Sequence, residues 1–264
     1  MIVAVYGKKV FQKQAYRIQL YIVTMANSKF ITLLHYILLD VIFPSFCVYC
    51  GKLISNGDGV CNNCKSIINL NIKNYSGEYV FSLEEEIHGK RKWFLDDGVW
   101  LFKYEEPVTQ LVYAMKFKHN KSIARLFAQY CTEAIDIMKW HFDFITYIPV
   151  SKDRLWKRGF NQSEVMARCI GKRYNIDVLN LLNIKNEKVA QKKLSGNERF
   201  VNTYQKYEII QDTSNIADKS VLIVDDVYTT GATINECARL LKINGVKHVY
   251  ACIVAYAMLK ELIV

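Results

Sequence analysis

Two adjacent acids and a run of small hydroxyl residues are the part of the chain best suited to chemistry. Asp225 and Asp226 follow four apolar residues, 221–224, and precede a turn that opens a helical pattern. The turn consists of Thr229, Thr230, Gly231, Ala232 and Thr233. Its hydroxyls and backbone N–H groups can surround a phosphate, which the positive end of the following helix stabilises. Carboxylates beside such a cup suit ribose hydroxyls and, directly or through water, Mg²⁺. The pattern indicates a sugar phosphate held beside magnesium; a surface acid pair with a threonine-rich turn is the plainer alternative.

Four cysteines form a second set with the spacing of metal ligands. Cys47, Cys50, Cys61 and Cys64 make two C-x2-C pairs separated by ten residues. Four thiolates complete a tetrahedral zinc shell, which leaves no open position for catalysis. Disulfides and a redox-active C-x2-C pair are the alternatives, but a redox pair explains only two of the four thiols. We therefore expect a structural zinc ribbon.

Composition and charge limit the classes of protein that fit. The chain has 264 residues, of which 51% are hydrophobic and 23% charged, as in ordinary globular proteins, so a disordered or fibrous chain is excluded. The net charge of +10 suits a phosphate-rich ligand or nucleic acid, although a solvated basic surface explains much of it. Four more cysteines are scattered through apolar stretches, which is typical of small buried side chains in a reducing compartment. We expect a cytoplasmic protein.

Apolar periodicity indicates the elements that must position these residues. Strands are expected at 97–104, 144–150, 221–224 and 249–255, and helices at 122–139, 163–173 and 233–244, with a further helix opened by Pro107. The strand–helix–strand rhythm predicts an α/β fold with a mostly parallel sheet flanked by helices. Ligands of such sheets bind at the carboxyl ends of the strands, where Asp225 and Asp226 stand.

The N-terminal third divides into smaller segments. Residues 1–24 precede a second methionine, Met25, and we interpret them as an upstream extension or a disordered arm. Residues 25–46 are expected to hold a packed amphipathic helix, which at 30–43 is too short to be a transmembrane segment; a weak membrane association is the alternative. Residues 47–70 would form the zinc ribbon, 71–96 a charged linker, and 97–264 the main domain.

Residues 221–233 resemble the signature of type I phosphoribosyltransferases, most closely the orotate-type version with two acids before Thr-Thr-Gly. Two further segments narrow the resemblance: Pro149-Val-Ser151 followed by Arg158-Gly-Phe-Asn-Gln162, and Gln191-Lys-Lys-Leu-Ser195 followed by Glu198-Arg199 and Asn202. In this order behind a cysteine ribbon, they resemble the ComF family, which includes ComF-type and GntX-type proteins. The resemblance extends over about residues 25–255. It implies the type I phosphoribosyltransferase fold and a phosphoribosyl diphosphate (PRPP) ligand bound with magnesium.

The resemblance also implies roles for individual residues. The loop that binds diphosphate would include Val150, Ser151, Lys152, Arg154 and Arg158, for which a solvated basic turn is the alternative. A lid over the site would include Lys192, Lys193 and Arg199, for which an exposed polar loop is the alternative. The chain departs from the family in carrying Lys185 and Lys188 before the lid, where arginines are usual, and in having a single ribbon.

Three functions remain open on the sequence. The chain could be an active phosphoribosyltransferase of nucleotide metabolism, in which Asp225 and Asp226 lie below an oxocarbenium-like sugar. It could instead handle single-stranded DNA in natural competence, with a competence helicase-type partner, as the resemblance implies. The clusters at 116–119 and 91–94, which mix basic and aromatic residues, are compatible with that role. It could also be a non-catalytic sensor of PRPP or a nucleotide.

Overall fold

A four-stranded parallel sheet organises the protein. The structure is a computed structural model and describes residues 45–54, 59–75, 93–185, 206–210 and 215–257. The strand order is β3-β8-β7-β4, and every neighbouring pair is parallel. The strands are β3 (Asp97–Lys103), β4 (Phe144–Tyr147), β7 (Ser220–Tyr228) and β8 (His248–Tyr256). The predicted α/β class with a parallel sheet is confirmed.

The central strand β7 is buried on both faces of the sheet. Val221, Leu222, Ile223 and Val224 have no exposed surface. Leu222 and Val224 belong to one hydrophobic cluster, whereas Val221 and Ile223 belong to a second cluster. This alternation follows from the two-residue period of a strand. A run of apolar residues is therefore what a strand between two helical layers needs.

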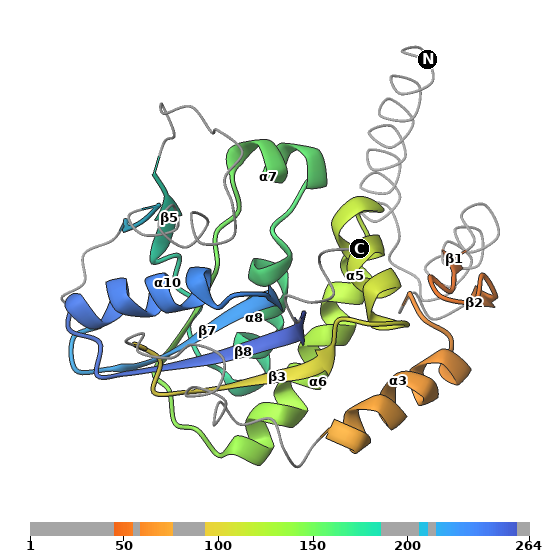
Figure 1. Cartoon of the computed structure of the whole chain (residues 1–264), viewed down its shortest axis with the longest axis horizontal. Helices are drawn as coiled ribbons and strands as arrows, with labels where there is room; N and C mark the ends of the chain where they lie inside the picture. Colours follow the sequence, from red (N-terminus) through yellow and green to blue (C-terminus); the bar gives the residue numbers. More distant parts are fainter. Residues whose placement is uncertain (1–44, 55–58, 76–92, 186–205, 211–214, 258–264) are drawn as a thin grey trace, which may run out of the picture.

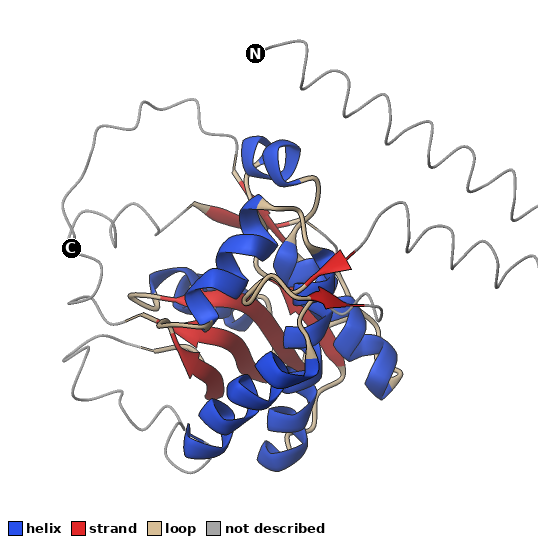
Figure 2. Cartoon of the chain, turned by 90° about the vertical axis from the view of Figure 1, so that its right-hand side faces the viewer, coloured by secondary structure: helices blue, strands red, loops and turns tan. Residues whose placement is uncertain are grey.

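Helices cover both faces of the sheet (Figures 1 and 2). The first cluster is formed with α5 (Val108–Phe117), α6 (Lys121–Met138) and α8 (Gln162–Tyr174). The second is formed with α10 (Ala232–Ile243), through Ile234, Cys237, Ala238 and Leu241. Asparagine side chains cap two of these helices: Asn120 accepts from the backbone N–H of Ser122, and Asn161 accepts from that of Ser163.

Several elements end at other residues than the sequence indicates. Strand β7 continues past Val224 to Tyr228, because β8 runs beside it and pairs with it as far as Tyr256. Because this extension contains polar residues, the apolar run in the sequence did not predict it. Strand β4 ends at Tyr147 rather than at residue 150. Residues 152–158, expected as a basic turn or loop, form the short helix α7 (Lys152–Arg158), which Ser151 caps.

The cysteine segment is small and packs on the main domain. A two-stranded antiparallel hairpin, β1 (Ser45–Phe46) and β2 (Leu53–Ile54), precedes α3 (Asn62–Tyr75). Helix α3 contacts β3, and Val60 and Ile68 belong to the cluster that includes Leu222 and Val224. Helix α3 crosses the expected boundary at residue 70. The N-terminal helix and the lid at 191–202 lie outside the described residues.

A second hairpin, β5 (Leu182–Ile184) with β6 (Tyr207–Ile209), lies beside α10. In the part of the chain that the structure describes, no helix combines the length and apolar character needed to cross a membrane.

Candidate functional site

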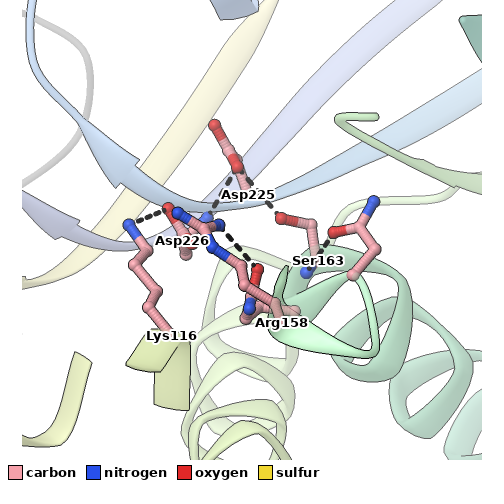
Figure 3. A network of polar contacts seen from close by, with 7 residues as sticks. Lys116, Arg158, Ser163, Asp225 and Asp226 are labelled. Carbon is pink, nitrogen blue, oxygen red and sulfur yellow. Dashed lines mark hydrogen bonds and ion pairs between the residues drawn. The ribbon is translucent and has the colours of Figure 1, made fainter. Parts of the chain in front are cut away.

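The acid pair lies at the carboxyl end of β7, where side chains from three helices meet it (Figure 3). Oδ1 of Asp225 accepts hydrogen bonds from the hydroxyl of Ser163 at 3.0 Å and from the backbone N–H of Asp226 at 2.8 Å. Oδ1 of Asp226 lies 2.9 Å from Nζ of Lys116. The two acids thus face different partners, one a hydroxyl and the other a cation.

The two acids differ in their electrostatic surroundings. Burial, followed by the nearby charge of Asp226, raises the pKa of Asp225 to about 7, although Lys116 and Ser163 oppose the shift. The side chain of Asp226 is 13% exposed, and that of its partner Lys116 is 17% exposed. Near neutral pH, Asp225 therefore exchanges its proton while Asp226 is held beside a cation.

Lys116 lies beside the acid pair, a position that the sequence did not indicate. It lies in the last turn of α5, and the sequence placed it only in the cluster of basic and aromatic residues at 116–119. Leu111, Val112 and Met115 are fully buried and fix that helix against the sheet. No local signal could have linked Lys116 to Asp226, because the contact joins distant parts of the chain.

The segment 158–163 has a structural explanation residue by residue. Arg158 donates from Nη1 to Oε1 of Gln162 at 3.1 Å, and its charge interacts with that of Asp226. Gly159 ends α7 with a φ of 74°, a left-handed conformation that favours glycine. Asn161 caps α8 through Oδ1 and donates from Nδ2 to the carbonyl of Ile148 at 2.9 Å. Asn161 therefore joins the loop after β4 to the helix that presents Ser163.

The threonine turn joins β7 to the amino end of α10. Gly231 is the first cap of that helix and has a φ of 69°. A Cβ at this position would lie 2.4 Å from the Trp93 ring and 2.6 Å from the Tyr228 hydroxyl. Oγ1 of Thr230 accepts from the backbone N–H of Ala232 at 3.4 Å. Only glycine fits here, on account of both its φ and the two aromatic rings.

Tyr207 is another residue near the turn that the sequence did not indicate. It is buried, and its side chain hydrogen-bonds with that of Thr233. Burial raises the pKa of Tyr207; the charge of Asp225 adds to this shift, and that of Arg154 opposes it. The β5–β6 hairpin therefore meets the turn at the amino end of α10.

Some of the residues predicted to bind diphosphate lie near the acid pair, and others do not. The loop after β4, with Val150 and Ser151, lies at the same sheet edge as the acids, because β4 pairs with β7 and Tyr147 stands opposite Val224. Of the cations, Arg158 reaches the acid pair, whereas Lys152 and Arg154 are exposed on α7. The cis peptide bond in the described residues is Glu106–Pro107, outside this loop. Lys192, Lys193 and Arg199 lie outside the described residues.

The four cysteines form a compact cluster. Their Sγ atoms lie within 4.8 Å of one another, and those of Cys50 and Cys61 are 3.7 Å apart. Zinc–sulfur bonds of ~2.3 Å in a tetrahedron place sulfur atoms about 3.8 Å apart, so the cluster fits the metal. All four are free thiols, so a disulfide pairing does not account for them. The expected second C-x2-C knuckle is instead the first turn of α3, which holds Cys64.

The surroundings of Cys47 and Cys61 favour the thiolate form, which binds metal cations. Burial raises the pKa of Cys47, but backbone N–H groups of Cys50, Cys61 and Tyr49 outweigh it and lower the pKa to about 6. The backbone N–H of Cys64 lowers the pKa of Cys61 in the same way. Burial and the other cysteines raise the pKa of Cys64. Neighbouring thiolates repel one another, and a shared metal ion removes that cost.

Comparison with known proteins supports the fold and finds similar sequences among competence proteins. The phosphoribosyl transferase domain model matches residues 177–262. Competence protein F of Haemophilus influenzae is 28% identical over 216 residues, which cover 77% of this chain and 93% of that protein. Competence protein ComFC of Streptococcus pneumoniae is 32% identical over 149 residues, 56% of this chain and 63% of that protein. The chain is thus similar to ComF-type competence proteins over most of its length.

This chain has the type I phosphoribosyltransferase fold, as its parallel sheet and the domain match together show. The DNA utilization protein YhgH of Escherichia coli is a further relative, 24% identical over 155 residues. Among solved structures, adenine phosphoribosyltransferase from Leishmania tarentolae aligns with a TM-score of 0.39 and 10% identity, over 62% of this chain and 92% of that one.

Proposed function

We propose that this protein, like the ComF family that it resembles, has a phosphoribosyltransferase-type site and binds PRPP, or a related phosphoribosyl ligand, together with Mg²⁺ at the carboxyl end of β7. The observation that carries the proposal is the continuous path from Asp225 and Asp226 to the turn at Gly231 and the amino end of α10. Backbone N–H groups at a helix start favour a phosphate, and the acids on the preceding strand favour ribose hydroxyls. Together they match a ligand that is both sugar and phosphate.

Magnesium fits the oxygen donors at this site. Asp225 and Asp226 offer carboxylates, and the ligand's own diphosphate supplies further oxygens of the kind that Mg²⁺ prefers. The ion would offset the negative charge of the diphosphate. Ser163 orients Asp225 through its hydroxyl, and Lys116 holds Asp226, so the acids are fixed before a ligand arrives.

Calorimetry with PRPP, in the presence and absence of Mg²⁺, tests the proposal. We expect micromolar binding that requires Mg²⁺ and is lost in the Asp225→Asn/Asp226→Asn variant. A wild-type protein that is folded and zinc-loaded but binds no PRPP would refute every function built on this site. Release of pyrophosphate with a panel of bases then separates an active transferase from a sensor.

A role in handling single-stranded DNA during competence is the second part of the proposal. The relatives named above are competence and DNA utilization proteins. In this chain, Tyr113 and Phe117 are 55% and 58% exposed, and their rings are in contact at a tilt of 39°, with centroids 4.9 Å apart. Cζ of Arg158 lies 5.8 Å from the centroid of the Phe117 ring, so aromatic and basic groups adjoin the proposed phosphoribosyl site. By contrast, Trp93 and Phe94 pack against the second cluster and are poorly placed to stack on bases.

A gel-shift titration of single-stranded DNA tests this part. Base stacking on an aromatic side chain contributes about 1–3 kcal/mol, so Tyr113→Ala/Phe117→Ala should weaken binding roughly tenfold or more. Binding should also fall with salt. Equal binding by wild type and the double variant would exclude α5 from the DNA-binding surface.

We also propose a cytoplasmic location, in keeping with the free thiols of all eight cysteines.

A further inference from the structure

Two cations from different elements flank Asp226. Lys116, from α5, contacts Oδ1 of Asp226 at 2.9 Å, and Arg158, from the end of α7, interacts with the same acid by charge. Figure 3 shows the two side chains approaching the acid pair from below the end of β7. Both are partly buried, and neither is a freely solvated surface residue.

Both cations keep donors that the described protein does not use. An ammonium has three N–H donors and a guanidinium has five. Among the described residues, Asp226 is the hydrogen-bonding or ion-pair partner of the Lys116 ammonium, and Gln162 accepts from one nitrogen of Arg158. The remaining donors stand next to the acids that would hold a ribose. Their number exceeds what one carboxylate and one amide oxygen can accept.

We propose that Lys116 and Arg158 together bind the diphosphate group of the ligand, with Lys116 as a diphosphate-binding residue supplied by α5. The inference rests on the proposed function and extends it. Arg158 offers a planar fork for phosphate oxygens, and Lys116 offers a point charge on a stem fixed by the buried face of α5. The exposed Lys152 and Arg154 lack such support.

The supports of the two cations are built into the fold. Gln162 has no exposed surface, and its Oε1 holds Arg158. Nδ1 of His119 lies 2.7 Å from the carbonyl oxygen of Arg158, which ties the residues after α5 to the end of α7. The two cations are thereby held near one another before any ligand binds, which lowers the entropy lost on binding.

Three ligands distinguish the inference from a role in folding. Ribose 5-phosphate lacks the diphosphate, magnesium pyrophosphate lacks the sugar, and PRPP with Mg²⁺ has both. For Lys116→Met, we expect the affinity for PRPP and for pyrophosphate to fall about tenfold or more, because a charged hydrogen bond is lost. The affinity for ribose 5-phosphate should change less than about threefold. Lys116→Arg should restore most of the lost affinity.

Lys172→Met is the matched control, since it removes the same charge from the exposed last turn of α8, at the opposite end of that helix from Ser163. It should bind all three ligands as the wild type does. If Lys116→Met does not fold, which its thermal unfolding would reveal, Lys116→Gln keeps a polar group beside Asp226 and should show the same selective loss.

Each other outcome overturns the inference in a different way. An equal loss for ribose 5-phosphate would mean that Lys116 only holds Asp226 in place. Unchanged pyrophosphate affinity would exclude Lys116 from the diphosphate site while leaving the proposed function intact. A wild-type protein that binds neither PRPP nor ribose 5-phosphate would refute the proposed function together with this inference.

Discussion

The cysteine cluster and the proposed phosphoribosyl site are assembled in opposite ways. The cluster takes its four ligands from residues 47–64, and a hairpin and one helix start suffice to bring them together. The proposed phosphoribosyl site has a continuous strand and turn at its centre, but Lys116, Arg158 and Ser163 reach it from three separate helices. A site built from a short segment depends on its ligand ion, whereas a site built across the fold depends on packing.

The two regions nevertheless share one hydrophobic cluster. Cys47, Cys61 and Cys64 belong to the same cluster as Leu222 and Val224 of β7. A Cβ at Gly59, where φ is 78°, would lie 2.9 Å from Cδ1 of Ile123 in α6. Loss of metal should therefore lower the stability of the domain without changing the chemistry of its ligand site.

Cys64→Ala should have the largest effect. Zinc binding contributes about 10–16 kcal/mol to the folding of zinc-finger peptides, and loss of one ligand should cost at least about 3 kcal/mol of stability here. Zinc content and thermal unfolding measure the effect. The PRPP affinity of the folded fraction should change less than about threefold. Loss of that affinity in step with zinc would show that the cluster shapes the ligand site.

Gly231→Ala should have the opposite effect to Cys64→Ala, because it should impair the proposed ligand site and leave zinc binding intact. The left-handed φ costs an alanine about 1 kcal/mol, and the clash with the Trp93 and Tyr228 rings should raise the total to roughly 3 kcal/mol. Denaturant unfolding and PRPP calorimetry should both show a loss, with zinc content unchanged. Gly51→Ala is the control, since its φ is 72° but nothing lies within 4 Å of the added Cβ. Equal losses in the two variants would assign the effect to φ alone.

Asn161→Ala removes the link between the loop after β4 and α8. Two buried hydrogen bonds are lost, at a cost of about 2–3 kcal/mol in denaturant unfolding. We expect PRPP binding to weaken as well, because Ser163 and Arg158 lie on either side of Asn161. Asn120→Ala, which removes only a helix cap, should cost about 1 kcal/mol and leave binding unchanged. Identical PRPP affinities in wild type and Asn161→Ala would limit Asn161 to folding.

Asp225→Asn should have the smallest effect on stability, and of the opposite sign. The pKa of Asp225 is about 7 in the folded protein and near 4 when unfolded, so the folded state binds more protons between these values. Wild-type stability should therefore fall as pH rises from 4 to 7, then level off. The variant should be about 1–3 kcal/mol more stable than wild type at pH 8 and little different at pH 4. Equal stabilisation at both pH values would contradict a raised pKa.

The fold class and the family resemblance could be predicted from the sequence, and so could the place of the two candidate ligand-binding segments, because each depends on neighbours along the chain. The apolar run at 221–224, the turn at 229–233 and the two C-x2-C pairs are local patterns whose geometry follows from strand and helix periods. The predicted ends of the helices and strands were less accurate. Asp225 and Asp226 lie inside β7, since pairing with β8 sustains the strand beyond its apolar part.

Tertiary structure alone decided which charges meet. The sequence offered Lys152, Arg154 and Arg158 as equivalent cations, but only Arg158 lies where the end of α7 turns back toward β7. It gave no reason to join Lys116 to Asp226 or Tyr207 to Thr233, because those contacts arise when helices and strands distant in the chain pack on one sheet. Local spacing determined what the chain could hold, and packing determined which side chains surround it.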